Sequence, residues 1–269
     1  MRIAYQGEPG AFSEQAAREY SGGAATVGWP TFRQVFEQVA SGGAQQGVIP
    51  VENSIMGSIP QNADLLMEHG LSIVGEITLR VSHCLIAHDG VRPADVRRVL
   101  AHPAAAAQCD RFLRAHPEWT VVPAYDTAGS VKMIREQGLL DAAAVASERA
   151  ARVYAMQIVA EAIEDSPHNF TRFVVIAREQ RVHARCTKTS VAYAARHEPG
   201  ALCGTLRIFA DRAINLTRIE SRPVPGRPWE YVFHVDFEGH VDAPVVSEAL
   251  ALLRERTLRL RVLGCYPGA

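Results

Sequence analysis

A threonine and an arginine stand side by side where an apolar run begins. Thr171 and Arg172 lie within Asn169-Phe170-Thr171-Arg172-Phe173, and the run from Phe173 to Ala177 predicts a buried strand. In an open α/β sheet ligands bind at the strand ends, so these polar groups are candidate ligand contacts. Neighbouring strand side chains point to opposite faces. Both groups therefore reach one ligand only if the strand has not fully begun at Thr171.

A second polar segment also follows a predicted strand. The strand runs from Gln46 to Val51, and Glu52-Asn53-Ser54-Ile55-Met56-Gly57-Ser58 comes directly after it. This segment is dense in short hydrogen-bond donors and acceptors, although an ordinary polar turn has a similar composition. Thr171 likewise fits a structural interpretation, because β-branched residues are common in strands. The interpretation as a site rests on the two segments occurring together.

Strands alternate with helices throughout residues 1–177, which predicts an α/β fold of parallel sheets with helices on both faces. About eight strands in this stretch favour two small lobes, and a cleft between lobes is a usual ligand site. The long extended segment from Leu71 to Ala87 carries Thr78 and His83. A histidine on such an apolar strand is either a core residue or an acid, and both interpretations stay open.

From Thr187 the pattern changes to strand, helix, strand, strand, helix, strand, which is the ferredoxin-like βαββαβ unit. The boundary falls in the arginine-rich segment from Arg178 to Arg185. We therefore expect a first domain over 1–178, with lobes at roughly 1–80 plus 158–178 and at 81–157. The second domain is expected over 187–269.

Composition excludes several classes of protein. The 269 residues are 48% hydrophobic and 21% charged, which is typical of a globular protein. Because 28 basic side chains nearly balance 29 acidic ones, a strongly basic nucleic-acid scaffold is not favoured. The five cysteines are widely spaced without a C-x-x-C motif, which favours reduced thiols in a cytoplasm over disulfides or a zinc site. We see no signal-peptide core and no transmembrane run, so we expect no membrane partner.

Together the motifs resemble the prephenate dehydratase family with a C-terminal ACT regulatory domain, over the full length. The segments that carry the resemblance are Gln6-Gly7, Gly10-Ala11-Phe12-Ser13, Val48 to Ser54 with Gly57-Ser58, His102-Pro103 with Gln108-Cys109, Asp126-Thr127-Ala128, Asn169 with Thr171-Arg172-Phe173, Gly200-Ala201-Leu202, and Glu220-Ser221-Arg222-Pro223. There are departures. The family commonly has Ser-His-Pro-Gln where this chain has Ala101-His102-Pro103-Ala104, and a threonine where this chain has Asn62.

The resemblance implies a two-lobed, periplasmic-binding-protein-like catalytic domain followed by an ACT domain. It implies that prephenate loses its ring hydroxyl and a carboxylate together, giving phenylpyruvate, carbon dioxide and water in phenylalanine biosynthesis. Because the product ring is aromatic, the enzyme must mainly orient the leaving groups and stabilise the departing hydroxide. No metal or organic cofactor is implied. The expected partners are prephenate, L-phenylalanine as effector, and further copies of the chain in a homodimer or homotetramer formed through the ACT domain.

Site residues follow from the same resemblance. Thr171 donates a hydrogen bond to the departing oxygen, and Arg172 suits a carboxylate. Glu52 is a general acid if burial raises its pKa, or else a structural acceptor. The expected catalytic set is Thr171, Arg172, Glu52, Asn53, Ser54 and Gln108; the substrate-binding set is Ser58, Thr127, Phe173, Thr78 and His83; the effector-binding set is Gly200, Ala201, Leu202, Glu220, Ser221, Arg222 and Pro223.

Two alternative functions stay open. An arogenate dehydratase performs the same chemistry on the amino analogue of prephenate, and the sequence does not separate a keto from an amino substrate. A non-catalytic amino-acid sensor could combine two binding lobes with an ACT domain. The intact Thr171-Arg172-Phe173 and Glu52-Asn53-Ser54 segments argue against such a loss of activity.

Overall fold

The structure is a computed structural model that describes residues 1–180, 182–224 and 226–269. The chain divides into two compact units. The first combines Met1–Gly57 with Thr78–Phe173, and the second combines Ser58–Ile77 with Val174–Ala269. Within the described residues, no helix is long and apolar enough to cross a membrane.

The first sheet holds the strands next to both polar segments, β3 at the start of the Glu52-to-Ser58 segment and β11 within and after the Asn169-to-Phe173 segment. Its strand order is β2-β1-β3-β11-β5, with β4 paired to β3. β1 runs parallel to both β2 and β3. The strands are β1 (Arg2–Gln6), β2 (Ala25–Trp29), β3 (Gln46–Asn53), β4 (Gly57–Ser58), β5 (Ser72–Arg80) and β11 (Phe170–Ala177), and the helices between them are α1 (Phe12–Ser21), α2 (Phe32–Ser41) and α3 (Pro60–His69). The adjacency of β3 and β11 brings the two polar segments together.

The second sheet has the strand order β10-β6-β9-β7-β8. β7 is parallel to β8 and β9, whereas β6 is antiparallel to β9 and β10. The sheet is therefore mixed rather than parallel as predicted. Its strands are β6 (Cys84–Ala87), β7 (Arg98–Ala101), β8 (Thr120–Pro123), β9 (Ala142–Ala146) and β10 (Gln157–Ala160); its helices are η1 (Pro93–Asp95), α4 (Pro103–Gln108), α5 (Asp110–Arg114), α6 (Thr127–Gln137) and α7 (Glu148–Val153).

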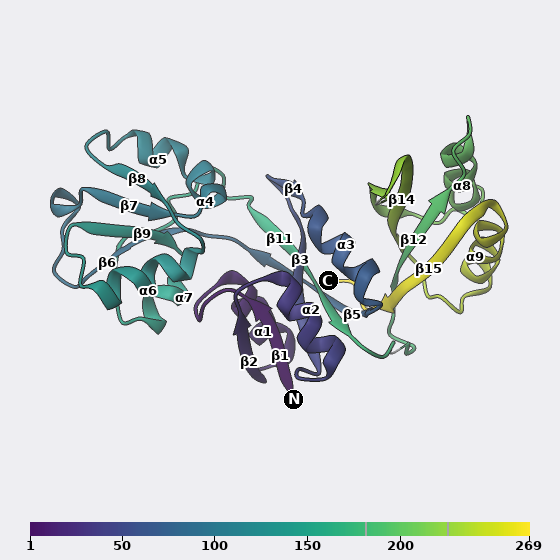
Figure 1. The fold of residues 1–269 in the computed structure, drawn as a ribbon, viewed down its shortest axis with the longest axis horizontal. Coiled ribbons are helices and arrows are strands. Elements are labelled where there is room, and N and C mark those ends of the chain that lie inside the picture. The colour runs from purple at the N-terminus through teal and green to yellow at the C-terminus, as the bar shows by residue number, and fades with distance from the viewer. Residues whose placement is uncertain (181, 225) are drawn as a thin grey trace. The chain divides into compact units, whose positions relative to one another are not determined.

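Successive side chains of β9 pack in different cores, so helices cover both faces of this sheet. Ala142, Ala144 and Ala146 pack in a core with residues of α6 and α7. Ala143 and Val145 pack in a separate core with residues of α4 and α5. Figure 1 shows these helices lying against the β6–β9 strands. The small alanines of β9 let the helices approach closely, and the predicted doubly wound arrangement is confirmed for this sheet.

The C-terminal elements confirm the predicted βαββαβ unit. The strand order is β13-β14-β12-β15, and the residues of α8 and α9 share one hydrophobic core with the sheet. A sheet packed by two helices on one face is the ferredoxin-like arrangement. The elements are β12 (Lys188–Ala195), α8 (Ala201–Ala210), β13 (Leu216–Val224), β14 (Arg227–Glu238), α9 (Pro244–Arg256) and β15 (Thr257–Tyr266).

Residues 58–77 belong to the same unit as these C-terminal elements, although the sequence places them in the first lobe. Glu76 is buried and accepts hydrogen bonds from Lys188 Nζ at 2.9 and 3.0 Å. A Cβ atom on Gly264 would lie 2.0 Å from the Ile73 carbonyl oxygen, so only glycine permits this backbone approach. β10 is a second difference, because it pairs with β6 and extends the second lobe beyond residue 157.

A buried carboxylate joins the two lobes of the first unit. Glu14 on α1 accepts hydrogen bonds from Arg149 Nε and Nη2 at 3.0 Å, from Arg18 Nε at 2.8 Å and from the Gly10 backbone N–H at 2.7 Å. Beside it, Gly10 has φ +93° and a Cβ there would lie 2.7 Å from the Ala150 Cα atom. Burial alone would raise the pKa of Glu14, but these hydrogen bonds lower it to about 2.

Replacing Glu14 by glutamine should lower the free energy of unfolding by on the order of 3 kcal/mol near pH 7, because Arg149 loses a buried partner charge. The folded pKa of about 2 lies below the ordinary 4.5. The stabilisation is therefore complete above pH 4.5 and disappears as the pH falls through about 2. Urea unfolding of both proteins across this range measures the difference.

The matched control is Glu148→Gln, because Glu148 forms an exposed i,i+4 pair with Arg152 within α7, the helix that also carries Arg149. Such a pair contributes at most about 1 kcal/mol. An effect of Glu14→Gln that is equal to the control, or that does not vary with pH, would contradict the assignment.

Candidate functional site

The side chain of Asn53, at the end of β3, reaches across to the start of β11. Its Nδ2 donates to Thr171 Oγ1 at 3.0 Å, to Asn169 Oδ1 at 2.8 Å and to the Phe170 carbonyl oxygen at 3.2 Å. Its Oδ1 accepts the backbone N–H groups of the turn that follows, from Ile55 at 3.0 Å and Met56 at 2.9 Å. Because both ends of the amide are used, its orientation is fixed.

The hydrogen bonds continue from Asn169 into the second lobe. Asn169 Nδ2 donates to Gln108 Oε1 at 2.9 Å, and the same oxygen lies 2.8 Å from His83 Nε2. An amide oxygen only accepts, so His83 must carry its proton on Nε2. Burial lowers the pKa of His83, against the opposing influence of Gln108 and Glu164. His83 therefore donates to Gln108 and holds it in place, and its role as an acid or as a substrate contact remains a prediction.

These contacts form one relay, which we define as His83, Gln108, Asn169, Asn53 and Thr171. At the last step of this relay, Thr171 Oγ1 accepts a hydrogen bond from the side-chain amide of Asn53. The hydroxyl hydrogen of Thr171 is then directed away from Asn53 and can donate to another group. Thr171 is 8% exposed, so this donor lies in a largely water-excluded place. A preorganised donor of this kind is suited to a developing negative charge on oxygen.

Ser54 fastens β3 to the residues just before Thr171. Its Oγ donates to the His168 carbonyl oxygen at 2.9 Å and accepts from the Phe170 N–H at 2.9 Å. Its own N–H donates to the Phe170 carbonyl oxygen at 2.8 Å. Since backbone groups use both functions of this hydroxyl, the geometry gives Ser54 a positioning role in the described conformation.

Arg172 lies on the other side of the strand. β11 begins at Phe170, so Thr171 and Arg172 are both inside it and point to opposite faces. The condition under which both would reach one ligand is therefore not met. Arg172 Nη1 lies 3.9 Å from Glu52 Oε2, so the two predicted residues form a pair of their own. The roles of Arg172 as a carboxylate ligand and of Glu52 as an acid remain predictions.

The other predicted substrate contacts are more scattered. Phe173 is 2% exposed and belongs to the core, and Thr78 is exposed on β5. Thr127 is half-buried at the first position of α6, and Ser58 is exposed in β4. In the described part of the first unit, no hydrogen bond joins Thr78, Thr127 or Phe173 to the relay. Their roles as substrate contacts remain predictions.

Sequence reasoning missed two buried polar residues. Asn169 is fully buried at the centre of the relay, and its inclusion in the Asn169-to-Phe173 motif was an available signal. Asp126 caps α6 by accepting the Gly129 N–H at 2.7 Å, and burial raises its pKa. A Cβ atom on Gly7 would lie 2.7 Å from Asp126 Oδ2. The glycine loop after β1 therefore approaches this carboxyl group closely.

The predicted effector residues fall in two places in the C-terminal unit. A hollow of about 120 Å³ is lined by Ala195–Glu198, by Ala201 and Leu202 at the start of α8, and by Trp229–Tyr231 and Phe233 of β14. Gly200 has φ +81°, a conformation that favours glycine. Glu220, Ser221, Arg222 and Pro223 lie on the edge strand β13 and do not line this hollow. There Glu220 pairs with Arg218, and Arg222 pairs with Asp64 at 2.7 Å.

Comparison with known proteins gives consistent results. Residues 3–181 match the family model for prephenate dehydratase, and residues 191–253 match the ACT domain model. Arogenate dehydratase/prephenate dehydratase 2 of Arabidopsis thaliana is 44% identical over 278 residues, covering 99% of this chain and 73% of the relative. Two solved structures are also similar. Prephenate dehydratase of Arthrobacter aurescens in complex with L-Phe has a TM-score of 0.91 at 31% identity, covering 99% of this chain and 90% of that one. A structure described as a novel type of quorum quenching acylase has a TM-score of 0.92 at 36% identity, covering 100% and 98%.

Proposed function

The chain belongs to the prephenate dehydratase family and carries an ACT domain, and we propose that it converts prephenate to phenylpyruvate, carbon dioxide and water. One observation of the site carries the proposal. The buried Thr171 hydroxyl accepts a hydrogen bond from Asn53, so its own hydrogen is available to a departing oxygen. The enzyme is thus a carbon–oxygen lyase of phenylalanine biosynthesis.

The reaction breaks two bonds of the substrate ring together. The bond to the ring carboxylate releases carbon dioxide and leaves its electron pair in the ring, while the hydroxyl leaves with the pair of the carbon–oxygen bond. The ring becomes aromatic, and the departing hydroxide takes a proton from the solvent to form water. A threonine hydroxyl is a poor acid, so Thr171 stabilises the developing charge by a hydrogen bond rather than by full proton transfer.

The other relay residues set the geometry of that donor. Asn53 turns the Thr171 oxygen into an acceptor, and Asn169 and Gln108 hold Asn53 and each other in place. Gln108 comes from α4 and His83 from the segment before β6, so both lobes contribute to one constellation. This rigidity matters because a misplaced donor loses most of its effect on the transition state.

One alternative concerns the substrate and a second concerns the type of reaction. Several plant relatives are named arogenate dehydratases, and arogenate carries an amino group where prephenate has a keto group. The acylase description of one similar structure suggests acyl transfer instead. Acyl transfer uses a nucleophile activated by a base. In the described residues the Thr171 hydroxyl is hydrogen-bonded to the amide of Asn53, and not to an imidazole or carboxylate that could act as the base. This arrangement favours the dehydratase.

Regulation and assembly extend the proposal. We propose that L-phenylalanine binds at the ACT domain, supported by the similar dehydratase solved in complex with L-Phe. Ala201 and Leu202 open α8, whose first N–H groups favour a carboxylate. We further propose a homodimer or homotetramer through the ACT sheet, whose edges are β13 and β15. A cytoplasmic location is supported by five free cysteines.

The proposed function is tested by comparing prephenate and arogenate as substrates of the purified chain, without added metal or nucleotide. We expect phenylpyruvate from prephenate at the higher kcat/KM. A higher kcat/KM for arogenate would reverse the substrate assignment, and acyl release without dehydration would reject the function.

The variants Thr171→Ala and Thr171→Ser belong to the same experiment. Losing one preorganised donor should lower kcat by roughly 10²-fold or more in Thr171→Ala. Thr171→Ser should recover part of it, because the hydroxyl is retained. Equal activity of the two variants would show that the hydroxyl has no catalytic role.

Leu202→Asp should weaken phenylalanine binding to the full chain by roughly 10²-fold, because it places a carboxylate in the hollow where an amino-acid carboxylate and apolar ring would lie. Isothermal titration calorimetry measures the dissociation constant. The matched control is Leu258→Asp, because Leu258 is 60% exposed on β15 and outside the hollow. Unchanged binding to Leu202→Asp would place the effector elsewhere.

A further inference from the structure

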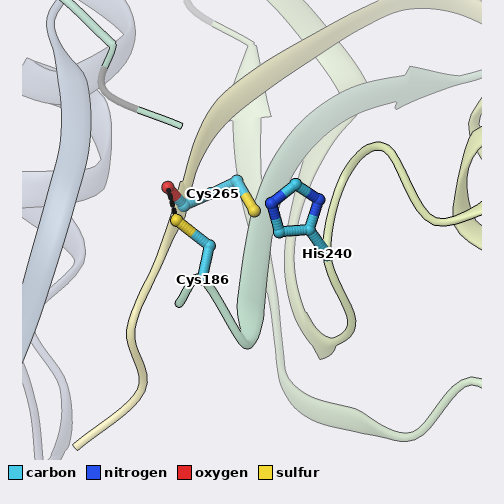
Figure 2. A group of neighbouring side chains, drawn as sticks. All are labelled: Cys186, His240 and Cys265. Atoms are coloured by element: carbon cyan, nitrogen blue, oxygen red, sulfur yellow. Dashed lines mark hydrogen bonds between the residues drawn. The ribbon is translucent and has the colours of Figure 1, made fainter. Parts of the chain in front are cut away.

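Three metal-ligating side chains come together in the C-terminal unit, away from any residue used above. The ligand atoms of Cys186, His240 and Cys265 all lie within 4.8 Å of one another. Cys186 immediately precedes β12, His240 lies between β14 and α9, and Cys265 is near the end of β15. Both cysteines are buried, and His240 is half-buried. Figure 2 shows the edge of the His240 ring facing the sulfur of Cys265.

Backbone groups already orient both sulfur atoms. The His183 N–H donates to Cys186 Sγ at 3.4 Å, and the Val241 N–H donates to Cys265 Sγ at 3.4 Å. The Cys186 thiol in turn donates to the Cys265 carbonyl oxygen at 3.2 Å. A metal ion bound to Cys186 would take the place of this thiol proton.

The imidazole of His240 is also held at both nitrogens. Nδ1 accepts the Asp242 N–H at 3.1 Å, and Nε2 lies 3.2 Å from the His183 carbonyl oxygen. In this neutral form the proton is on Nε2, because the carbonyl oxygen only accepts. The Asp242 carboxylate Oδ2 lies 3.8 Å from Nδ1. When Nε2 binds a metal the ring proton moves to Nδ1, and a carboxylate in this place can accept a hydrogen bond from that N–H.

We propose that Cys186, His240 and Cys265 form a binding site for a thiolate-preferring divalent ion, with Zn²⁺ as the best match. Two sulfurs and one imidazole nitrogen are ligands that zinc favours and that calcium and magnesium do not. Binding forms two Zn–S bonds and one Zn–N bond, releases one proton from each thiol, and leaves the fourth tetrahedral position to water. Two sulfurs bound to one zinc lie about 3.8 Å apart, and a sulfur and an imidazole nitrogen lie about 3.5 Å apart, so the ligand atoms need to close by at most about 1.3 Å.

The site would fasten the start of the ACT unit to its end. Cys186 stands before the first strand and Cys265 in the last one, 79 residues apart in sequence. A metal that binds only the folded state stabilises that state in proportion to its occupancy. The bound ion therefore acts as a structural cross-link, a role for which the sequence alone gave no spacing motif.

The test uses the full chain, reduced, treated with a chelator and titrated with Co²⁺ as a spectroscopic probe. We expect one Co²⁺ per chain, with the near-ultraviolet charge-transfer band of a cobalt thiolate and the intense visible bands of tetrahedral geometry. Zn²⁺ should displace it and raise the melting temperature. His240→Asn should weaken binding by roughly 10²-fold or more, since even outer-shell losses cost up to that amount.

Cys203→Ser is the matched control, because Cys203 is a free, exposed cysteine on α8. It should bind Co²⁺ as the unchanged chain does. Cys186→Ser should abolish the thiolate band. His240→Asn changes a half-buried side chain and keeps both buried thiols, so it tests the site even if Cys186→Ser fails to fold. The proposal is overturned if no thiolate band appears, or if Cys203→Ser and His240→Asn behave alike.

Discussion

The direction of the hydrogen bonds around Asn53 determines what the rest of the site can do. Its amide hydrogens point at Asn169, Phe170 and Thr171, and its oxygen is used by the turn that follows β3. A buried amide that is satisfied at both ends does not flip without losing several contacts. Thr171 is consequently an acceptor toward the protein, and its own hydrogen is free to point elsewhere. The proposed role of Thr171 as a donor to the substrate depends on this direction of the hydrogen bond.

Residues of both lobes fix the direction of the hydrogen bonds around Asn53. Gln108 and His83 complete the relay from the second lobe, and Glu14 with Arg149 joins the lobes elsewhere. The glycine loop after β1 fits against the second lobe with so little space that added Cβ atoms at Gly7 and Gly10 would collide with Asp126 and Ala150. Glycines at these positions follow from contact between lobes.

Local patterns in the sequence predicted the elements well. The C-terminal βαββαβ order is confirmed, and the strands predicted at Gln46–Val51 and Phe173–Ala177 are confirmed within β3 and β11. Each depends on neighbouring residues. The antiparallel pairing of β6, the pairing of β10 with β6 and the grouping of residues 58–77 with the C-terminal elements were not predicted, because they depend on contacts between distant segments. For the same reason Asn53 and Thr171 were expected near one ligand, but the relay through Asn169 and the separate Arg172–Glu52 pair were not.

The most direct test reverses the polarity of the Asn53 amide and measures kcat in a double-mutant cycle with Thr171→Val. Asn53→Asp keeps the shape but offers only acceptors, so the Thr171 hydroxyl would donate to the new carboxylate and lose its hydrogen for the substrate. The account predicts a large loss of kcat for Asn53→Asp alone and little further loss when it is added to Thr171→Val. Losses that multiply in the double variant would contradict it, because the two residues would then act independently.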